Sequence, residues 1–253
     1  MNVLGRKQLG RVVAIVQARI GSTRLPGKIL LDILGKPMLY RVVERSRRAR
    51  LLDATIVATT DKPSDDLIEE LCAANGWSCF RGSEADVLDR YFRAAQAFEA
   101  EVVVRITSDC PLIDPALIDK IVQAYSDAEG EMDYVTNTIR PTSFPRGLDV
   151  EVVRFSALER AWQDDKNVEW REHVTLYIKR HPELFRSKSV SNGQDYSWMR
   201  WTVDTPEDLE FVRRIYAHFG HDRFSWGDVV LALEQHPEWL ATNRHVQQKA
   251  EPI

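Results

Sequence analysis

VVAIVQARIGSTRLPGK, residues 12–28, is the stretch that decides the fold of this chain. Its first five residues are apolar and mostly β-branched, which predicts a strand buried on both faces of an α/β sheet. The loop that follows carries three cations, Arg19, Arg24 and Lys28. Open α/β sheets bind ligands at the carboxyl ends of their strands, so this loop predicts a polyanion site, most simply for a triphosphate.

The loop is not a Walker A phosphate-binding loop. Five residues rather than four separate Gly21 from Gly27, and Ile29 stands where that motif has Ser or Thr. Pro26 also removes a backbone N–H that a phosphate cradle would use. The cations therefore belong to another kind of nucleotide site.

Strand and helix patterns alternate after this loop. We expect strands over 55–59, 77–80 and 102–106, and helices over 38–50, 64–76, 86–100 and 115–125. This alternation predicts an α/β fold with a Rossmann-like, doubly wound, mostly parallel sheet. No linker or repeat divides the chain, so we expect one domain over residues 1–253, with flexible tails at 1–11 and 242–253.

The pattern changes after residue 133. Segments 134–138 and 148–152 alternate like strands around two prolines and a glycine, which predicts a β-hairpin excursion over 134–153, outside the parallel core. Further helices are expected over 156–163, 168–180, 206–219 and 226–235, with one more strand over 198–203.

Two aspartates follow predicted strands. Asp109 comes after the strand 102–106, and Asp204 comes after the strand 198–203. Both would lie at the carboxyl edge of the sheet, where a pair of carboxylates can bind Mg²⁺ together with phosphate oxygens. Taken singly, Asp109 could also be a turn residue and Asp204 a helix N-cap.

These motifs, taken together, resemble one family of enzymes. The loop Ala18–Lys28, Asp109-Cys110-Pro111-Leu112 and the run Asp204–Asp208 are similar to motifs of the sugar-acid cytidylyltransferases, which include the CMP-Kdo and CMP-sialic acid synthetases. The segments 144–151 and 172–175 are most similar to the spore coat polysaccharide biosynthesis subgroup. The resemblance covers about residues 12 to 219. Thr107-Ser108 replaces the Gln-Gly often found in Kdo enzymes, so the resemblance does not specify the sugar.

The resemblance implies a nucleotide-diphospho-sugar transferase type of sheet and transfer of CMP from CTP to an acid sugar. It implies catalytic roles for Arg19, Arg24 and Lys28, with Mg²⁺ on Asp109 and Asp204. It implies nucleotide-binding roles for Ala18, Gly21, Ser22, Arg81, Ser83 and Thr107. It places Arg146, Asp149, Glu151 and His173 near the sugar, and it implies a homodimer formed through the excursion.

Composition limits the other partners. The net charge of −4 offers no general attraction to nucleic acid or to an anionic membrane, and no apolar run approaches a membrane span. Three cysteines without a CxxC pair indicate reduced thiols and a cytoplasmic protein.

Two other functions stay open. One is a glycosyltransferase that uses a nucleotide sugar, although no suitable Asp-x-Asp motif occurs. The other is a non-catalytic nucleotide-binding protein on the same fold. The choice of base is open too, because a guanylyl- or uridylyltransferase would need much the same phosphate loop.

Overall fold

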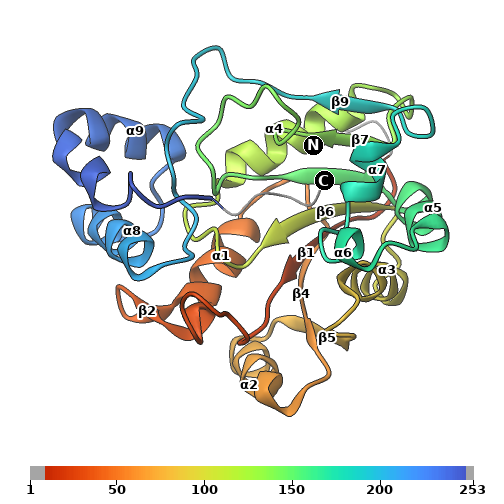
Figure 1. Cartoon of the computed structure of the whole chain (residues 1–253), viewed down its shortest axis with the longest axis horizontal. Coiled ribbons are helices and arrows are strands. Elements are labelled where there is room, and N and C mark those ends of the chain that lie inside the picture. Colours follow the sequence, from red (N-terminus) through yellow and green to blue (C-terminus); the bar gives the residue numbers. More distant parts are fainter. Residues whose placement is uncertain (1–8, 249–253) are drawn as a thin grey trace, which may run out of the picture.

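A mixed seven-stranded sheet forms the centre of the computed structural model, which describes residues 9–248 (Figure 1). In spatial order the strands are β5 (Ser78–Gly82), β4 (Ala54–Thr60), β1 (Val12–Gln17), β6 (Val102–Thr107), β8 (Glu151–Arg154), β7 (Tyr134–Thr136) and β9 (Ser187–Ser189). Only β8 runs against the others in this sheet. The expected doubly wound, mostly parallel sheet is confirmed.

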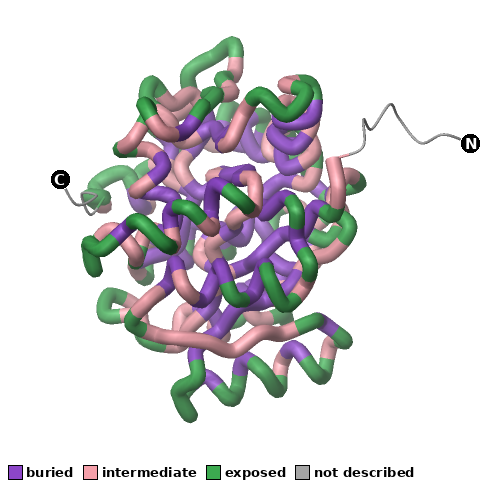
Figure 2. The backbone as a smooth tube through the Cα atoms, turned by 90° about the vertical axis from the view of Figure 1, so that its right-hand side faces the viewer, coloured by how far each residue is buried: buried purple, intermediate pink, exposed green. Residues whose placement is uncertain are grey.

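Helices cover both faces of the sheet (Figure 1). One face packs against α1 (Met38–Ser46), α2 (Asp66–Asn75), α4 (Pro115–Ser126), α8 (Pro206–Phe219) and α9 (Trp226–Gln235). The other packs against α3 (Val87–Ala97), α5 (Phe155–Asp164) and α7 (Leu176–Arg180), with the short α6 (Val168–Arg171) beside α7. Side chains of β1 enter the two cores alternately, so the run Val12–Val16 is fully buried, as its apolar pattern predicts. Buried segments run through the interior of the molecule, and exposed segments lie mainly at its periphery (Figure 2).

Short elements complete the chain. A small antiparallel pair, β2 (Asp32–Ile33) and β3 (Lys36–Pro37), precedes α1. Three 3₁₀ turns lie at η1 (Lys28–Leu30), η2 (Pro63–Asp65) and η3 (Pro237–Thr242). No helix in residues 9–248 is long and apolar enough to cross a membrane.

The structure corrects the expected hairpin excursion. Both ends of segment 134–153 join the sheet: β8 pairs antiparallel with β6, and β7 pairs with β8 and β9, while the connection over 137–150 forms no strand. The alternating pattern predicts strands correctly, and β8 joins them to the parallel core by pairing with β6. Because β8 lies next to β6 inside the sheet, both of its faces are buried: Val152 packs in one core and Val153 in the other.

Two other expectations were wrong. Residues 198–203 form no strand and make only an isolated bridge between Arg200 and Arg146. The expected helix over 168–180 is interrupted between α6 and α7, where Val174 has a left-handed φ of 58°. Within the tail predicted from residue 242, Asn243 is buried and donates a hydrogen bond to the Arg200 carbonyl. Residues 1–8 and 249–253 of the two predicted tails lie outside the described residues.

Candidate functional site

The candidate site lies where the chain reverses its direction across the sheet. From β1 the chain adds β4 and β5 on one side, then returns to add β6 on the other side of β1. The carboxyl ends of β1 and β6 meet at this switch point, where ligands of open α/β sheets bind. The loop 18–28 follows β1, and Asp109 follows β6, so the fold brings these two motifs together.

Lys28 joins the two predicted metal-binding aspartates. Its Nζ lies 3.0 Å from Oδ2 of Asp109 and 2.9 Å from Oδ1 of Asp204. It also donates to the carbonyl oxygen of Val203 at 2.8 Å. Only 12% of the lysine side chain is exposed, so this contact between residues far apart in sequence is shielded from water.

The other two cations of the loop lie at its more exposed side. Arg24 Nη2 is 3.0 Å from Asp204 Oδ1 and adds a second cation to that carboxylate. Arg19 Nη2 is 3.3 Å from Oε1 of Glu172, which belongs to the break between α6 and α7. About two fifths of each arginine side chain is exposed, so both can reach a ligand.

The charges of Lys28 and Asp109 stabilise each other. Burial by itself would lower the pKa of Lys28, but the charges and hydrogen bonds of Asp109 and Asp204 raise it above its ordinary value. Burial would raise the pKa of the Asp109 carboxyl, and the charge of Lys28 with a hydrogen bond from Thr107 lowers it instead. The site therefore presents charged groups, which suits the binding of a charged ligand.

The oxygens around Lys28 also suit a hard cation. Two carboxylates and one carbonyl surround its ammonium group within 3.0 Å, so these oxygens already bind a positive charge. No group of three or more Asp, Glu, His or Cys side chains that could hold a metal ion occurs in residues 9–248. Mg²⁺ is often bound by one or two carboxylates with the remaining positions taken by phosphates and water, so the pair fits Mg²⁺.

The expected nucleotide-binding residues divide into two groups. Ala18, Gly21 and Ser22 belong to the loop after β1, and Thr107 ends β6 with its hydroxyl 3.2 Å from Cys110 Sγ. Arg81 lies in the edge strand β5 instead, and Ser83 directly follows that strand. Arg81 is held by Asp66 at 2.7 Å and Glu69 at 2.8 Å, while the Ser83 hydroxyl accepts a hydrogen bond from the backbone N–H of Asp86 at 3.1 Å.

The expected sugar-binding residues also differ in their surroundings. Burial raises the pKa of the Asp149 carboxyl, which lies close enough to Cys110 and Arg146 to interact electrostatically with both. His173 lies in the break between α6 and α7, next to the Glu172 partner of Arg19.

Glu151 is an internal ion-pair residue. Only 4% of its side chain is exposed, and it binds Arg105 at 3.2 Å, Lys179 at 3.1 Å and the Thr175 hydroxyl at 2.5 Å. A direct contact between Glu151 and a sugar would therefore need some of these partners to be replaced.

Sequence reasoning missed the residues behind Asp204. Arg200 binds the Asp204 carboxylate at Oδ2, Asp208 accepts a hydrogen bond from the Asp204 backbone N–H, and Asn243 binds both Arg200 and Asp208. The spacing of Arg200 and Asp208, four residues before and four after Asp204, is a signal that could have drawn attention to them. Nothing in the sequence near Asn243 indicates that it reaches this place.

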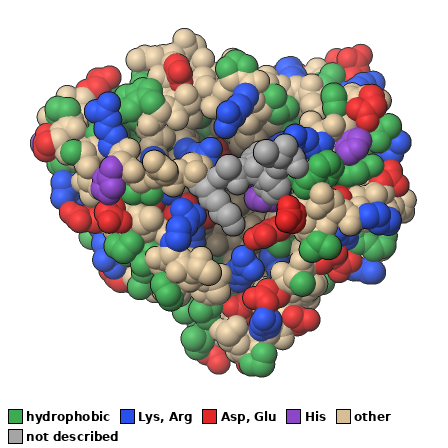
Figure 3. Space-filling model, viewed as in Figure 1, with side chains coloured by type: hydrophobic (Ala, Val, Ile, Leu, Met, Phe, Trp, Pro, Cys, Tyr) green, Lys and Arg blue, Asp and Glu red, His purple; other side chains and the backbone are tan. Residues whose placement is uncertain are grey.

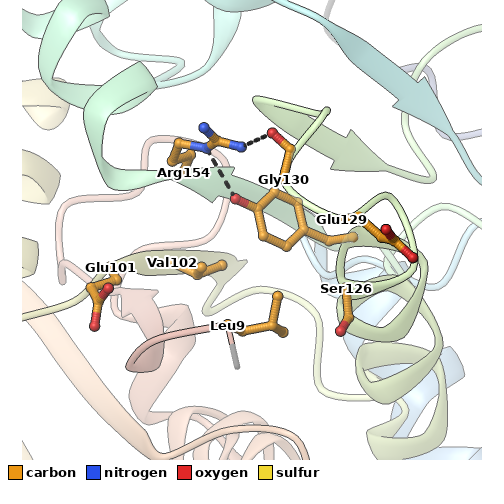
Figure 4. A pocket seen from close by; sticks show the side chains of 8 residues that line it. Leu9, Glu101, Val102, Ser126, Glu129, Gly130 and Arg154 are labelled. Atoms are coloured by element: carbon orange, nitrogen blue, oxygen red, sulfur yellow. Dashed lines mark hydrogen bonds between the residues drawn. The ribbon is translucent and has the colours of Figure 1, made fainter. Parts of the chain in front are cut away.

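Two surface features lie away from Lys28, Asp109 and Asp204. A pocket of about 440 Å³ lies at the amino end of β6, the opposite edge of the sheet, between Leu9, Glu101 and the end of α4 (Figure 4). Arg154 spans part of it, bound to the Gly130 carbonyl and the Tyr125 hydroxyl. On the face shown in Figure 3, basic and acidic side chains are interspersed rather than gathered into one basic patch.

Comparisons with known proteins agree with this geometry. A family model described as cytidylyltransferase matches residues 13–235. The spore coat polysaccharide biosynthesis protein SpsF of Bacillus subtilis is 35% identical over 243 residues, covering 92% of this chain and 98% of that protein. A 3-deoxy-manno-octulosonate cytidylyltransferase of Anaeromyxobacter dehalogenans is 30% identical, covering 81% of this chain and 98% of that protein.

A solved structure is similar over nearly the whole length. The structure of a cytidylyltransferase from Leptospira borgpetersenii superposes with a TM-score of 0.88 at 33% identity, covering 95% of this chain and 99% of that one. The loop after β1, Asp109 and Asp204 all lie within residues 13–235, the part of the chain that the family model matches.

Proposed function

We propose that this chain, which belongs to the cytidylyltransferase family, transfers CMP from CTP to an acid sugar of the Kdo or nonulosonic type. Nucleotidyl transfer follows from the family, and the acid sugar is the part that we propose. The relatives named for Kdo transfer and for spore coat polysaccharide synthesis support an acid sugar destined for a surface polysaccharide.

The observation that carries the proposal is the contact of Lys28 with Asp109 and Asp204 at the switch point of the sheet. A triphosphate bound there would meet three cations on one loop. It would also meet two carboxylates able to bind Mg²⁺, the cofactor that we propose. Neither a scaffold role nor a purely structural ion pair requires three cations on one loop next to two carboxylates.

The reaction in this site is an in-line displacement. A hydroxyl oxygen of the sugar forms a bond to the α-phosphorus of CTP and gives up its proton to solvent water. The bond from that phosphorus to the bridging oxygen breaks, and pyrophosphate leaves with the electron pair. Catalysis of this kind depends mainly on positioning and on neutralising charge.

The residues of this chain have defined roles in that step. Lys28 and Arg24 would turn from Asp204 to the leaving phosphates, and Arg19 offers its planar guanidinium to phosphate oxygens. Asp109 and Asp204 would hold Mg²⁺. When bound, that ion neutralises phosphate charge and lowers the pKa of a coordinated hydroxyl.

The test is pyrophosphate release with each of the four nucleoside triphosphates, Mg²⁺ and a panel of acid sugars that includes Kdo and nonulosonic acids. We expect release with CTP and one acid, and a CMP-sugar as the second product. Release of free nucleotide from a nucleotide sugar would indicate the glycosyltransferase alternative. No turnover with any acid, together with no binding of any triphosphate, would contradict the proposal.

The homodimer and the cytoplasmic location remain predictions. Sedimentation of the purified chain tests the first. Because β7 and β8 lie inside the sheet, we expect dimer contacts to come from the connection between them, residues 137–150, rather than from free strand edges.

A further inference from the structure

The two oxygens of the Asp204 carboxylate have different partners. Oδ1 faces the loop, 2.9 Å from Lys28 Nζ and 3.0 Å from Arg24 Nη2. Oδ2 faces the other way and accepts a hydrogen bond from Arg200 Nη2 at 2.9 Å. The carboxylate is therefore held at one oxygen and presented to the site at the other.

Arg200 is itself held by a buried carboxylate. Its Nε lies 2.8 Å from Asp208 Oδ1, and its Nη2 lies 2.9 Å from Asp208 Oδ2. The Asp208 side chain is fully buried, and only 9% of the Arg200 side chain is exposed. This two-point contact fixes the plane of the guanidinium group.

Asp208 also holds the backbone at Asp204. Its Oδ2 accepts hydrogen bonds from the backbone N–H of Asp204 at 3.0 Å and of Thr205 at 3.1 Å. The second bond belongs to the capping box at the start of α8. One carboxylate thus sets both the backbone and, through Arg200, the side chain of Asp204.

The C-terminal segment completes the arrangement. After η3 the chain brings Asn243, which is only 3% exposed, against this cluster. Its Nδ2 donates to Asp208 Oδ1 at 3.0 Å and to the carbonyl of Arg200 at 2.9 Å. The amide therefore links the two residues that hold Asp204.

We propose that Arg200, Asp208 and Asn243 are positioning residues that keep one oxygen of Asp204 aimed at the cation and phosphate site. This inference rests on the proposed function. Asp204 has three cationic partners, Lys28, Arg24 and Arg200. When the two loop cations turn to the phosphates, Arg200 remains bound to Oδ2 as a counter-ion, so the Asp204 carboxylate stays in place for the metal.

The test is the affinity of the full chain for Mn²⁺, measured by the electron paramagnetic resonance of free Mn²⁺ without nucleotide or sugar. Because Lys28 lies among the same oxygens, each titration is run with Lys28 present and with Lys28→Met. We expect Lys28→Met to bind Mn²⁺ more tightly. Mutating a residue that hydrogen-bonds to a metal ligand lowers metal affinity by about 10- to 100-fold. We therefore expect Arg200→Lys and Asn243→Ala each to weaken Mn²⁺ binding by about tenfold.

A matched pair of aspartates separates positioning from stability. Asp228 has the same place in the capping box of α9 that Asp208 has in α8, away from the site. We expect Asp208→Asn and Asp228→Asn both to lower the melting temperature, and only Asp208→Asn to weaken Mn²⁺ binding.

Three outcomes would overturn the inference. The first is no Mn²⁺ binding with Lys28 present and none with Lys28→Met. The second is binding by folded Arg200→Lys and Asn243→Ala within twofold of their parent. The third is equal loss of Mn²⁺ affinity in Asp208→Asn and Asp228→Asn. A failure to find the sugar acceptor would leave all three results unaffected, so this test and that of the proposed function can fail separately.

Discussion

Three charged side chains define the site at the scale of single residues. The cation-rich loop and the two aspartates could be predicted from the sequence, because each follows an apolar strand-like run. The structure adds that Lys28 contacts both aspartates directly. Lys28 is the main counter-ion of the buried Asp109, whereas Lys28 without Asp109 would still be bound to Asp204.

Asp109→Asn tests this arrangement. The change keeps the shape of the side chain and removes its charge, so we expect CTP-dependent pyrophosphate release to fall by about 100-fold or more, with an unchanged far-ultraviolet circular dichroism spectrum. Asp127→Asn, an exposed change at the end of α4, serves as the control and should keep full activity. Activity of Asp109→Asn within threefold of the unaltered chain would show that this carboxylate is not needed.

The partners of Asp204 show what single-residue reasoning could not reach. Asn243 is separated from Asp208 by 35 residues, and their contact depends on how η3 packs on α8. A polar segment near the C-terminus predicts a flexible tail, and no local pattern distinguishes one buried asparagine within it. Long-range hydrogen bonds of this kind become visible only in the folded chain.

At the scale of elements, the segment 198–203 determines where Asp204 lies in the site. The predicted strand over 198–203 is absent, and the segment is held instead against the turn at Gly147. Gly147 has a φ of 102°, and a Cβ there would lie 2.5 Å from Thr202 N and 2.7 Å from the Trp201 carbonyl carbon. The backbone at Gly147 packs closely against the backbone of Trp201 and Thr202, and no regular strand pairing forms there. The apolar alternation of residues 198–203 could not reveal this close contact.

Gly147→Ala should therefore disturb both stability and function. We expect the free energy of unfolding in urea to fall by about 1–3 kcal/mol, because the new methyl group meets backbone atoms and the φ is strained for alanine. The affinity for CTP should fall as well, since residues 201–204 carry Asp204 into the site. Gly193→Ala is the control, because a Cβ there meets nothing within 4 Å. Equal stability of the two variants would contradict this account of Gly147.

At the scale of the whole molecule, a buried ion network links the parallel strands of the sheet to β8 and α7. Glu151 on β8 binds Arg105 on β6, the neighbouring strand of the sheet. It also binds Lys179 on α7, a helix packed on that sheet. Burial alone would raise the pKa of Glu151, but the charges of Lys179 and Arg105 lower it to about 2. The helix–strand alternation predicted this sheet and its order of elements. It could not predict that β8 would join β6, because the pairing of distant strands leaves no local signal.

Glu151→Gln should weaken the fold in a pH-dependent way. Removing one partner of a buried ion network costs about 3 kcal/mol, which should appear in urea unfolding at pH 7. Because the folded pKa of Glu151 lies below its ordinary value of 4.5, the carboxylate contributes fully above pH 4.5 and loses its contribution as the pH falls through about 2. The difference between the two proteins should shrink over that range.

An exposed ion pair provides the comparison for Glu151. Asp164→Asn breaks the surface contact between Arg160 and Asp164 on α5, and it should change the unfolding free energy by less than about 0.5 kcal/mol. A difference between Glu151→Gln and the unaltered chain that stays constant down to pH 2 would contradict the assignment of the charge.

The most direct measurement is a crystal structure of the chain with CTP and Mg²⁺. We predict that the triphosphate lies along residues 18–28 with Lys28 Nζ on its phosphate oxygens, and that a metal ion replaces this ammonium group between Asp109 and Asp204. A triphosphate bound elsewhere, or a Lys28 that still bridges the two aspartates with CTP in place, would contradict the account.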